Sequence, residues 1–430
     1  MLLLRVVATF TACAWAFAPS APLSARRPSA LMAESSVQER VASTAANAAI
    51  AAAAVSKAVS TRETAAPDLD AKSYVAIDDS AADEMGRRSD ARAARDGGAA
   101  TGGLPRVYDR AAIEQYWKKE RGELQKRWGE FLGYAVPFLT KVVSALVQGG
   151  PDELLARAGP LAKEAREDME ALGPTYIKLG QMMSVRPDVL PPEVLAELAT
   201  LQDAVAPFDS AVARATIESE LGRSVDDVFS ELSAEPVAAA SLAQVYRGVL
   251  RASGDVVAVK VQRPAVLETV SKDLYVLRRA AEVYQGLVER FAPQQRTDYV
   301  ALFNEWAVGF YTELDFVNEA RNQVRMRDAL VGRAPRVYVP AVYEDLTTPR
   351  LLVSEWLDGV KLSELPAAET RRLIDVGQEA FLIQLLELGF FHADPHPGNM
   401  LRTPDGKLVI LDFGLMTEVR ARLHHSLPCP

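Results

Sequence analysis

Two short stretches near the C-terminal end constrain the fold more than any other part of the sequence. The first, FFHADPHPGNML at 390–401, gathers two of the four histidines with an Asp and an Asn. The second, LVILDFGL at 408–415, ends an apolar run with Asp412. The segment LRTPDGKLVIL, between Asn399 and Asp412, predicts a short β-hairpin that turns at Pro404-Asp405-Gly406. Such a hairpin would hold Asn399 and Asp412 on adjacent backbone segments, with Asp394 just upstream.

A zinc site and a pair of simple turns are alternatives for these stretches. His392, Asp394 and His396 are zinc-ligand types at alternating positions. However, Pro395 and Pro397 fix the backbone there, and no cysteine or fourth ligand lies in the neighbourhood. A pair of ordinary turns would leave the two acids and the amide without a role.

Phosphate handling is the third interpretation and accounts for most of these residues. Asp394 precedes Asn399 by five residues, and Asp412 follows Asn399 by thirteen. Mg²⁺ prefers hard oxygen ligands, which Asn399 and Asp412 supply. Asp394 would accept a hydroxyl proton or orient a water. This order resembles the catalytic Asp, metal-binding Asn and metal-binding Asp of protein kinases.

A lysine upstream fits the same chemistry. Two strand patterns, at 237–250 and 256–264, are separated by RASGD, a tight turn that contains glycine. Lys260 lies within the β-branched run VVAVKV, where a buried ammonium needs an anionic partner unless it reaches solvent. The link that precedes this hairpin consists of the small residues Ala238, Ala239, Ala240 and Ser241.

Carboxylates follow in a predicted helix. The stretch TDYVALFNEWAVGFYTELDFVNEARNQVRM predicts one continuous helix that holds Glu313, Asp315 and Glu319. At 100° per residue, Asp315 and Glu319 share a face while Glu313 lies well around the cylinder, so at least one carboxylate turns inward. Two further strands end in Glu355, just before an Asp-Gly turn.

The first 104 residues have the composition of a targeting sequence followed by a linker. MLLLRVVATFTACAWA is typical of a signal peptide, and the Ser-, Ala- and Arg-rich segment after it has no acid before Glu34. We interpret 1–34 as a signal plus plastid transit presequence. Plain secretion is the alternative, although Cys13 and Cys429 are the only cysteines and provide no disulfide framework. The Ala-rich segment 35–104 is predicted to be a disordered linker.

A helical block is predicted from about residue 107. Its apolar side chains fall mostly on one helical face: Ile113, Trp117, Leu124, Trp128, Phe131 and Leu132. A second helical block covers about 152–172. In the third stretch, GPTYIKLGQMM, the polar residues Lys178 and Gln181 sit in an apolar helix, where each needs a partner or an exit to solvent.

Taken together, AAAS, KLGQ, ELDFVNEARN and HADPHPGN resemble the motifs of the UbiB, or aarF-domain, atypical kinase family, also called ABC-one kinase-like, over about 106–416. The resemblance implies an α+β, protein-kinase-like bilobal fold with a small β-sheet N-lobe, a helical C-lobe and a helical N-terminal extension. The expected boundaries are 105–222 for the extension, 223–358 for the N-lobe and 359–430 for a partial C-lobe.

The resemblance also implies residue roles. Lys260 would bind the α- and β-phosphates of ATP (or ADP) and pair with a glutamate, for which we expect Glu313. Asp394 would be catalytic, and Asn399 and Asp412 would bind Mg²⁺. The alanine-rich nucleotide loop would comprise Ala238, Ala239, Ala240 and Ser241, and Glu355 would lie in the hinge facing adenine. Residues of the occluding or regulatory motifs would be Lys178, Gln181, Asp315 and Glu319.

The implied function is that of a kinase-like ATPase or phosphotransferase. Family resemblance and the presequence both point to a plastid, with association to plastoglobules or thylakoids, a lipid or prenylquinone partner and support of plastoquinone or tocopherol metabolism. The net charge of −9 offers no broad basic surface for nucleic acid. Only 16 residues follow Gly414, so we expect an incomplete C-lobe. The alternative function is a catalytically impaired scaffold (a pseudokinase) that binds nucleotide or lipid.

Overall fold

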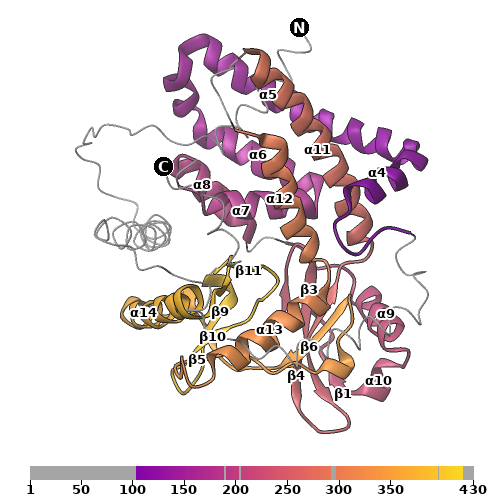
Figure 1. Ribbon diagram of the computed structural model, residues 1–430, viewed down its shortest axis with the longest axis vertical. Helices are drawn as coiled ribbons and strands as arrows, with labels where there is room; N and C mark the ends of the chain where they lie inside the picture. Colours follow the sequence, from indigo (N-terminus) through magenta and orange to yellow (C-terminus); the bar gives the residue numbers. More distant parts are fainter. Residues whose placement is uncertain (1–102, 188–189, 203–204, 292–296, 396, 420–430) are drawn as a thin grey trace, which may run out of the picture. The chain divides into compact units, whose positions relative to one another are not determined.

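The structure, a computed structural model, describes residues 103–187, 190–202, 205–291, 297–395 and 397–419 (Figure 1). The chain forms two compact units. The helical unit contains 109–205 and 267–308, and the mixed unit contains 206–266 and the chain from 309 onward. The sequence placed 267–308 with the N-lobe, whereas these residues pack with the N-terminal helices.

The helical unit is built from α4 (Arg110–Lys119), α5 (Arg121–Ala156), α6 (Ala158–Leu172), α7 (Pro174–Ser184), α8 (Pro192–Ala199), the 3₁₀ turn η3 (Thr200–Gln202), α11 (Val266–Phe291) and α12 (Tyr299–Thr312), of which the residues from Gly309 on belong to the mixed unit. The predicted apolar face is largely confirmed, since Ile113, Trp117 and Leu124 are buried. Phe131 is also buried, but Leu132 is 41% exposed, because neighbouring side chains on a helix point about 100° apart.

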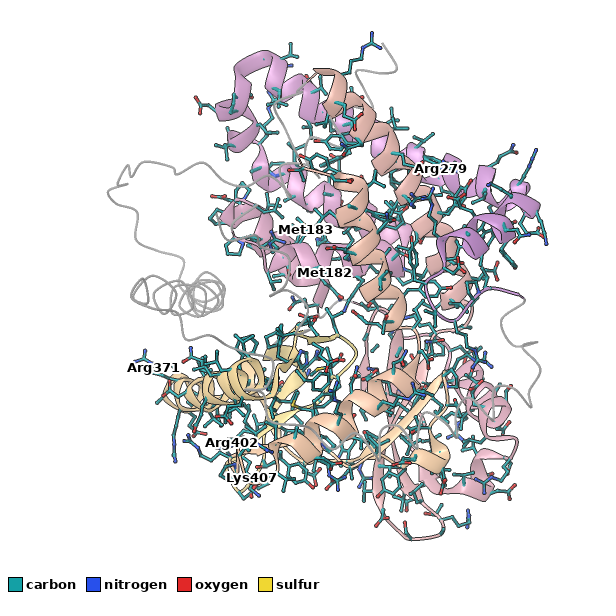
Figure 2. The ribbon with its side chains drawn as sticks, viewed as in Figure 1. Met182, Met183, Arg279, Arg371, Arg402 and Lys407 are labelled. Atoms are coloured by element: carbon teal, nitrogen blue, oxygen red, sulfur yellow. The ribbon has the colours of Figure 1, made fainter. Side chains whose placement is uncertain are left out.

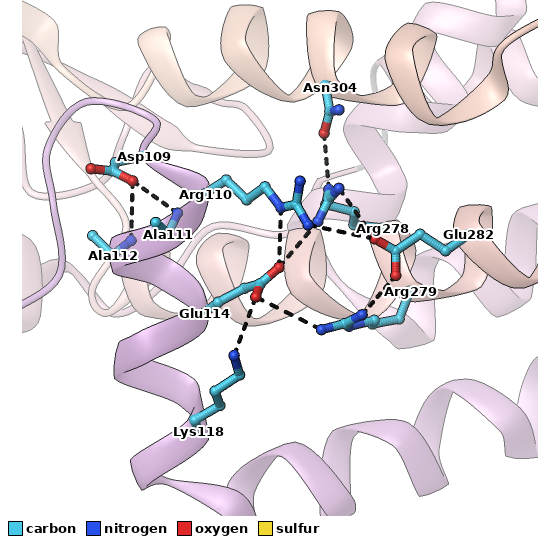
Figure 3. Close-up of polar contacts among 10 residues, drawn as sticks. All are labelled: Asp109, Arg110, Ala111, Ala112, Glu114, Lys118, Arg278, Arg279, Glu282 and Asn304. Carbon is cyan, nitrogen blue, oxygen red and sulfur yellow. Dashed lines mark hydrogen bonds and ion pairs between the residues drawn. The ribbon is translucent and has the colours of Figure 1, made fainter.

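Ion pairs fasten α4 to α11 in the helical unit (Figure 3). Asp109 caps α4 by accepting hydrogen bonds from two backbone N–H groups of the first turn. Glu114 Oε1 accepts from Arg278 Nη1 at 3.1 Å, and its other oxygen lies 3.7 Å from Arg279 Nη2. Arg278 Nε donates to Asn304 Oδ1 on α12 at 3.0 Å. The guanidinium of Arg278, which is buried, thereby joins three helices.

A buried aspartate on α11 joins this helix to two others of the unit, α5 and α7. Asp273 on α11 is fully buried and accepts from Arg127 Nε on α5 at 2.5 Å. It also accepts from Thr175 Oγ1 on α7 at 2.6 Å. Because a buried carboxylate is costly unless it is paired and hydrogen-bonded, these contacts fix the mutual positions of the three helices.

The helix α5 has the length and composition of a membrane span, alone among the described helices. Its most apolar 18-residue window has a mean hydropathy of 1.4, and 22% of that window is buried. Within the helix, Lys141 pairs with Glu164 of α6 at 2.6 Å.

Glycine at position 180 allows α7 to approach η3. A Cβ there would collide with Leu201 Cδ1 and lie 2.8 Å from Met169 Sδ. The neighbouring Gln181 Nε2 donates to the Leu201 carbonyl at 2.9 Å. Further along α7, Met182 (labelled with Met183 in Figure 2) accepts from the Trp306 indole at 2.8 Å.

We expect Gly180→Ala to lower the free energy of unfolding by about 1–3 kcal/mol, because it overpacks this contact. Gly133→Ala on α5 is the control, since a Cβ at Gly133 meets nothing within 4 Å. That change should stabilise by up to about 1 kcal/mol through helix propensity. Urea unfolding measures both. Equal stability of the two variants would contradict the tight packing at Gly180.

The mixed unit begins with a small antiparallel sheet. Its elements are α9 (Ser210–Leu221), α10 (Val225–Val228), β1 (Phe229–Leu232), β2 (Ala238–Ala239), β3 (Ala243–Leu250), β4 (Val256–Gln262) and β6 (Leu351–Glu355). The strand order is β1-β3-β4-β6, with β2 paired to β3. The predicted β3–β4 hairpin is confirmed, and Gly254 in its turn has a φ of 77°. Val257, Val259 and Val261 alternate with Lys260 along β4 and fill the core beneath α9.

The remainder of the mixed unit contains α13 (Phe316–Leu330), β5 (Val337–Tyr338), the 3₁₀ turn η4 (Glu344–Leu346), β7 (Val360–Lys361), the 3₁₀ turn η5 (Leu362–Glu364), α14 (Ala367–Ile383), the π-helical turn η6 (Gln384–Leu388), β8 (Phe390–His392), the 3₁₀ turn η7 (Pro397–Asn399), β9 (Met400–Arg402), β10 (Leu408–Ile410) and β11 (Met416–Glu418). The predicted hairpin is confirmed as β9–β10. The pairing of β11 with β8 places Met416 opposite His392, so the two opening motifs lie side by side. The α+β prediction is confirmed.

The prediction of one continuous helix through Glu313 and Glu319 is wrong. The helix α12 ends at Thr312 and α13 begins at Phe316. Asp315 is the N-cap of α13, and its carboxylate accepts from Val317 N at 3.0 Å. The break is held from β4, because buried Gln262 Nε2 donates to the Leu314 carbonyl at 2.7 Å.

Candidate functional site

Lys260 on β4 forms a bidentate ion pair within the mixed unit. Its Nζ lies 2.6 Å and 2.8 Å from the two carboxylate oxygens of Glu319 on α13. The same ammonium lies 5.1 Å from the centroid of the Phe316 ring. The expectation that Glu313 holds the lysine is therefore corrected, because the break before α13 turns Glu319, which is 2% exposed, toward β4.

The charges of three carboxylates act on this ammonium. Although burial alone lowers the pKa of Lys260, the charges of Asp412, Glu319 and Glu313 raise it to about 12. Burial raises the pKa of Glu319 to about 7, and repulsion from Asp412 and Glu313 adds to it while Lys260 acts against it. The charge of such carboxylates is of the kind that a divalent cation compensates when it binds.

The raised pKa of Glu319 predicts a pH-dependent stability. An acid with a raised folded-state pKa binds its proton more tightly when folded, so stability is lost as pH rises from about 4.5 to about 7. The span of this loss is about 3 kcal/mol. The variant Glu319→Gln should lack this decrease in the free energy of unfolding with rising pH. Urea unfolding between pH 5 and 8, without added metal or nucleotide, measures it. Exposed Glu364→Gln is the control. Parallel curves for wild type and Glu319→Gln would contradict the expectation.

Asp412 and Asn399 lie together beside this ion pair. Asn399 Nδ2 is 3.4 Å from Asp412 Oδ2, and the Asn399 carbonyl accepts from Leu411 N at 3.0 Å. Gly414 N donates to Asp412 Oδ1 at 2.9 Å. A Cβ on Gly414 would lie 3.3 Å from Asp412 Oδ1 and 3.4 Å from Glu313 Cγ. Glu313 therefore borders the Asp-Phe-Gly turn.

His392 connects the two opening motifs through both of its ring nitrogens. Asp394 N donates to Nδ1 at 3.0 Å, and Nε2 lies 2.7 Å from the Asp412 carbonyl. The first bond leaves Nε2 as the protonated nitrogen, which donates to that carbonyl. Because both nitrogens are occupied, His392 is not free to bind zinc, and His396 lies outside the described residues. Within the described ranges, no group of three or more His, Cys, Asp or Glu side chains could hold a metal ion.

Asn322 on α13 is a site residue that the sequence reasoning missed. Its Nδ2 donates to the Phe413 carbonyl at 3.0 Å, between Asp412 and Gly414. Asn322 follows Glu319 by three residues, so both side chains share one helical face. One helix therefore holds both Lys260 and the Asp-Phe-Gly turn. The i, i+3 spacing within NEARN was the signal that could have revealed it.

The alanine-rich stretch forms a tight connection between β2 and β3. Ala240 N donates to the Ala243 carbonyl at 2.7 Å, and Ser241 is buried. Ala238 and Ala239 pair with β3 opposite Val245 and Gln244. Its role as a nucleotide loop remains a prediction.

Glu355 ends β6 at the predicted hinge, but its carboxylate has partners within the protein. It accepts from the Tyr338 hydroxyl at 2.9 Å and 3.0 Å and from Ala341 N at 3.0 Å. An adenine contact therefore remains a prediction for the backbone of this segment. Lys178 and Gln181 lie on α7 in the helical unit, and their occluding role also remains a prediction.

Comparison with known proteins gives matches over this region. A family model described as the ABC1 atypical kinase-like domain matches residues 200–427. An uncharacterized chloroplastic aarF domain-containing protein kinase of Arabidopsis thaliana is 46% identical over 276 residues, which cover 63% of this chain and 39% of that protein. The chloroplastic protein ACTIVITY OF BC1 COMPLEX KINASE 3 of Arabidopsis thaliana is 45% identical over 294 residues, which cover 67% of this chain and 40% of that protein.

The chain spans about two fifths of the length of these curated relatives. A solved structure of a Mycobacterium tuberculosis protein in complex with erythromycin is 28% identical and has a TM-score of 0.42. The aligned region covers 65% of this chain and 67% of the Mycobacterium tuberculosis chain.

Proposed function

Since the chain belongs to the ABC1 atypical kinase-like family, we propose that it binds Mg²⁺-ATP and hydrolyses it or transfers its terminal phosphoryl group to an acceptor. The observation that carries the proposal is the convergence at Lys260. The ammonium is held by Glu319 at 2.6 Å and lies in the field of Asp412, which is 3.4 Å from Asn399. A lysine and two metal-ligand types within one small space are what phosphoryl transfer requires.

The donor set fits Mg²⁺. Asp412 offers carboxylate oxygens and Asn399 an amide oxygen, and Mg²⁺ is commonly held by one or two such ligands together with substrate phosphates. The charges of Asp412, Glu319 and Glu313 all act at Lys260, and a divalent cation would be attracted to the same place. When bound, Mg²⁺ supplies positive charge against the phosphate oxygens.

The protein side chains would then divide the work as follows. Lys260 neutralises phosphate charge, and its bidentate pair with Glu319 fixes the direction of the ammonium. Asp394 accepts a proton from the attacking hydroxyl or water. His392 connects the backbone of Asp394 to that of Asp412 and so limits how far the two segments can move apart.

A plastid role in prenylquinone metabolism, for example of plastoquinone or tocopherol, extends this proposal. Two Arabidopsis thaliana relatives are named chloroplastic proteins, and this supports a plastid location. The lipid class rests on the family resemblance. A lipid or membrane-surface partner belongs to the same proposal, and α5 provides an apolar helix of suitable length.

Phosphate release from ATP by the purified chain tests the proposal. We expect release in excess Mg²⁺ and none above background when a chelator removes the metal. Thermal unfolding with ATP is measured in parallel. Stabilisation by Mg²⁺-ATP without turnover would overturn the enzyme and favour the nucleotide-binding scaffold. If ATP is neither turned over nor stabilises the protein, nucleotide binding itself is overturned.

A further inference from the structure

Arg263, at the end of β4, joins two segments that are distant in sequence. Its Nη2 donates to the Ala206 carbonyl at 2.5 Å, and its Nε donates to the Ala240 carbonyl at 3.2 Å. The guanidinium carbon lies 5.5 Å from the centroid of the Phe208 ring. Within the described part of the chain, the partners of this half-buried cation are carbonyl groups and a ring instead of carboxylates.

The two segments have different roles in the chain. Ala206 is the first residue of the mixed unit after the chain leaves the helical unit, and 206–208 is therefore named the entry segment. Ala240 belongs to the alanine-rich loop 238–241. Arg263 itself stands three residues before Val266, where the chain passes back into the helical unit. Its guanidinium thus connects the entry segment, where the chain enters the mixed unit, with the alanine-rich loop.

A second set of contacts ties the entry segment to the same loop. The buried amide of Gln244, on β3, accepts from Phe208 N at 3.0 Å and donates to the Phe208 carbonyl at 3.2 Å. Gln244 is paired with Ala239 across the β2–β3 ladder. Arg263 N also donates to the Leu242 carbonyl at 2.9 Å. The entry segment and the loop are therefore joined on two sides.

We propose that Arg263 is a positioning residue that couples the entry segment to the alanine-rich loop, and that this coupling sets the affinity of the loop for nucleotide phosphates. The forked guanidinium donates to two carbonyls at once, which a lysine ammonium on a flexible stem does less well. Alanines at φ < 0 also give the loop less freedom than glycines would. A displacement of the entry segment would therefore move the loop. The effect on nucleotide affinity rests on the proposed function, whereas the coupling of the entry segment to the loop does not.

Hydrogen exchange of the full chain without nucleotide tests the tie. Phe208 N and Ala240 N are hydrogen-bonded reporters in the two segments. In Arg263→Lys, we expect peptides covering both segments to exchange about tenfold faster, as for the loss of a charge-assisted hydrogen bond. The control Arg247→Lys changes an exposed arginine on β3 and should leave both unchanged. Unchanged exchange, or a change in only one segment, would overturn the coupling.

Nucleotide kinetics test the consequence. Arg263→Lys should raise the KM for ATP about tenfold with kcat within a factor of two, because the loop would contact phosphates equally in the ground and transition states. Phe208→Leu, which keeps both guanidinium bonds, should have a smaller effect. An unchanged KM alongside faster exchange would overturn the link to nucleotide. Absence of ATP binding by the wild type would instead overturn the proposed function, and the exchange experiment would still decide the tie.

Discussion

Asp412→Asn is expected to lower Mg²⁺-dependent ATP turnover by about 100- to 1000-fold, as for the loss of one electrostatic transition-state contact. The substitution removes a negative charge that acts on Lys260 and that belongs to the proposed Mg²⁺ site. It keeps the shape of the side chain, and the amide oxygen can still accept from Gly414 N, which donates to Oδ1 at 2.9 Å. The fold should therefore persist. Phosphate release at saturating ATP, over a Mg²⁺ titration, measures the effect.

The control for this prediction is Asp345→Asn, which removes one carboxylate charge from an exposed position on the 3₁₀ turn η4. This variant should turn over ATP like the wild type. The Asp412→Asn variant should also need more Mg²⁺ for half-maximal rate. Equal rates in the two variants would show that any turnover does not pass through Asp412.

Lys260→Met is expected to lower ATP turnover at least as much as Asp412→Asn does. It should also destabilise the fold. The change leaves Glu319 buried without its cation, and breaking a buried pair in this way costs about 3 kcal/mol. The cost should be largest at pH 8 and smaller at pH 6, because burial already raises the pKa of Glu319 to about 7 and protonation removes the unpaired charge. Urea unfolding at the two pH values measures it.

The double variant Lys260→Met with Glu319→Gln separates stability from chemistry. It removes both charges of the pair, so it should recover most of the stability lost in Lys260→Met. Turnover should remain absent, because no ammonium is present to neutralise phosphate. Recovered turnover in the double variant would mean that Lys260 acts only in folding.

Local features of the site followed from the sequence. The β3–β4 hairpin and the β9–β10 hairpin were both predicted from apolar runs around glycine-containing turns, and both are present. The interactions that define such hairpins are close in sequence, so turn chemistry and side-chain alternation carry enough information. The order of lysine, carboxylate helix, Asn399 and Asp412 likewise follows directly from the chain.

Partner choices within the site did not follow from the sequence. Glu313 and Glu319 are both carboxylates close to Lys260, and only the helix break capped by Asp315 presents Glu319 to the ammonium. The prediction from helical periodicity extended the helix through this segment. The hydrogen bond from Gln262 on β4 to the Leu314 carbonyl at the break joins residues distant in sequence, so periodicity does not reveal it.

By itself, the sequence determined the β3–β4 and β9–β10 hairpins and the chemical types available to the site, because these depend on residues only a few positions apart. Tertiary structure alone decided that Glu319 holds the lysine, that Asn322 holds the Asp-Phe-Gly turn and that Arg263 joins Ala206 to Ala240. Each of these bonds connects positions at least 23 residues apart. Such pairings form only when separately folded elements are packed together, and that packing is a property of the whole chain.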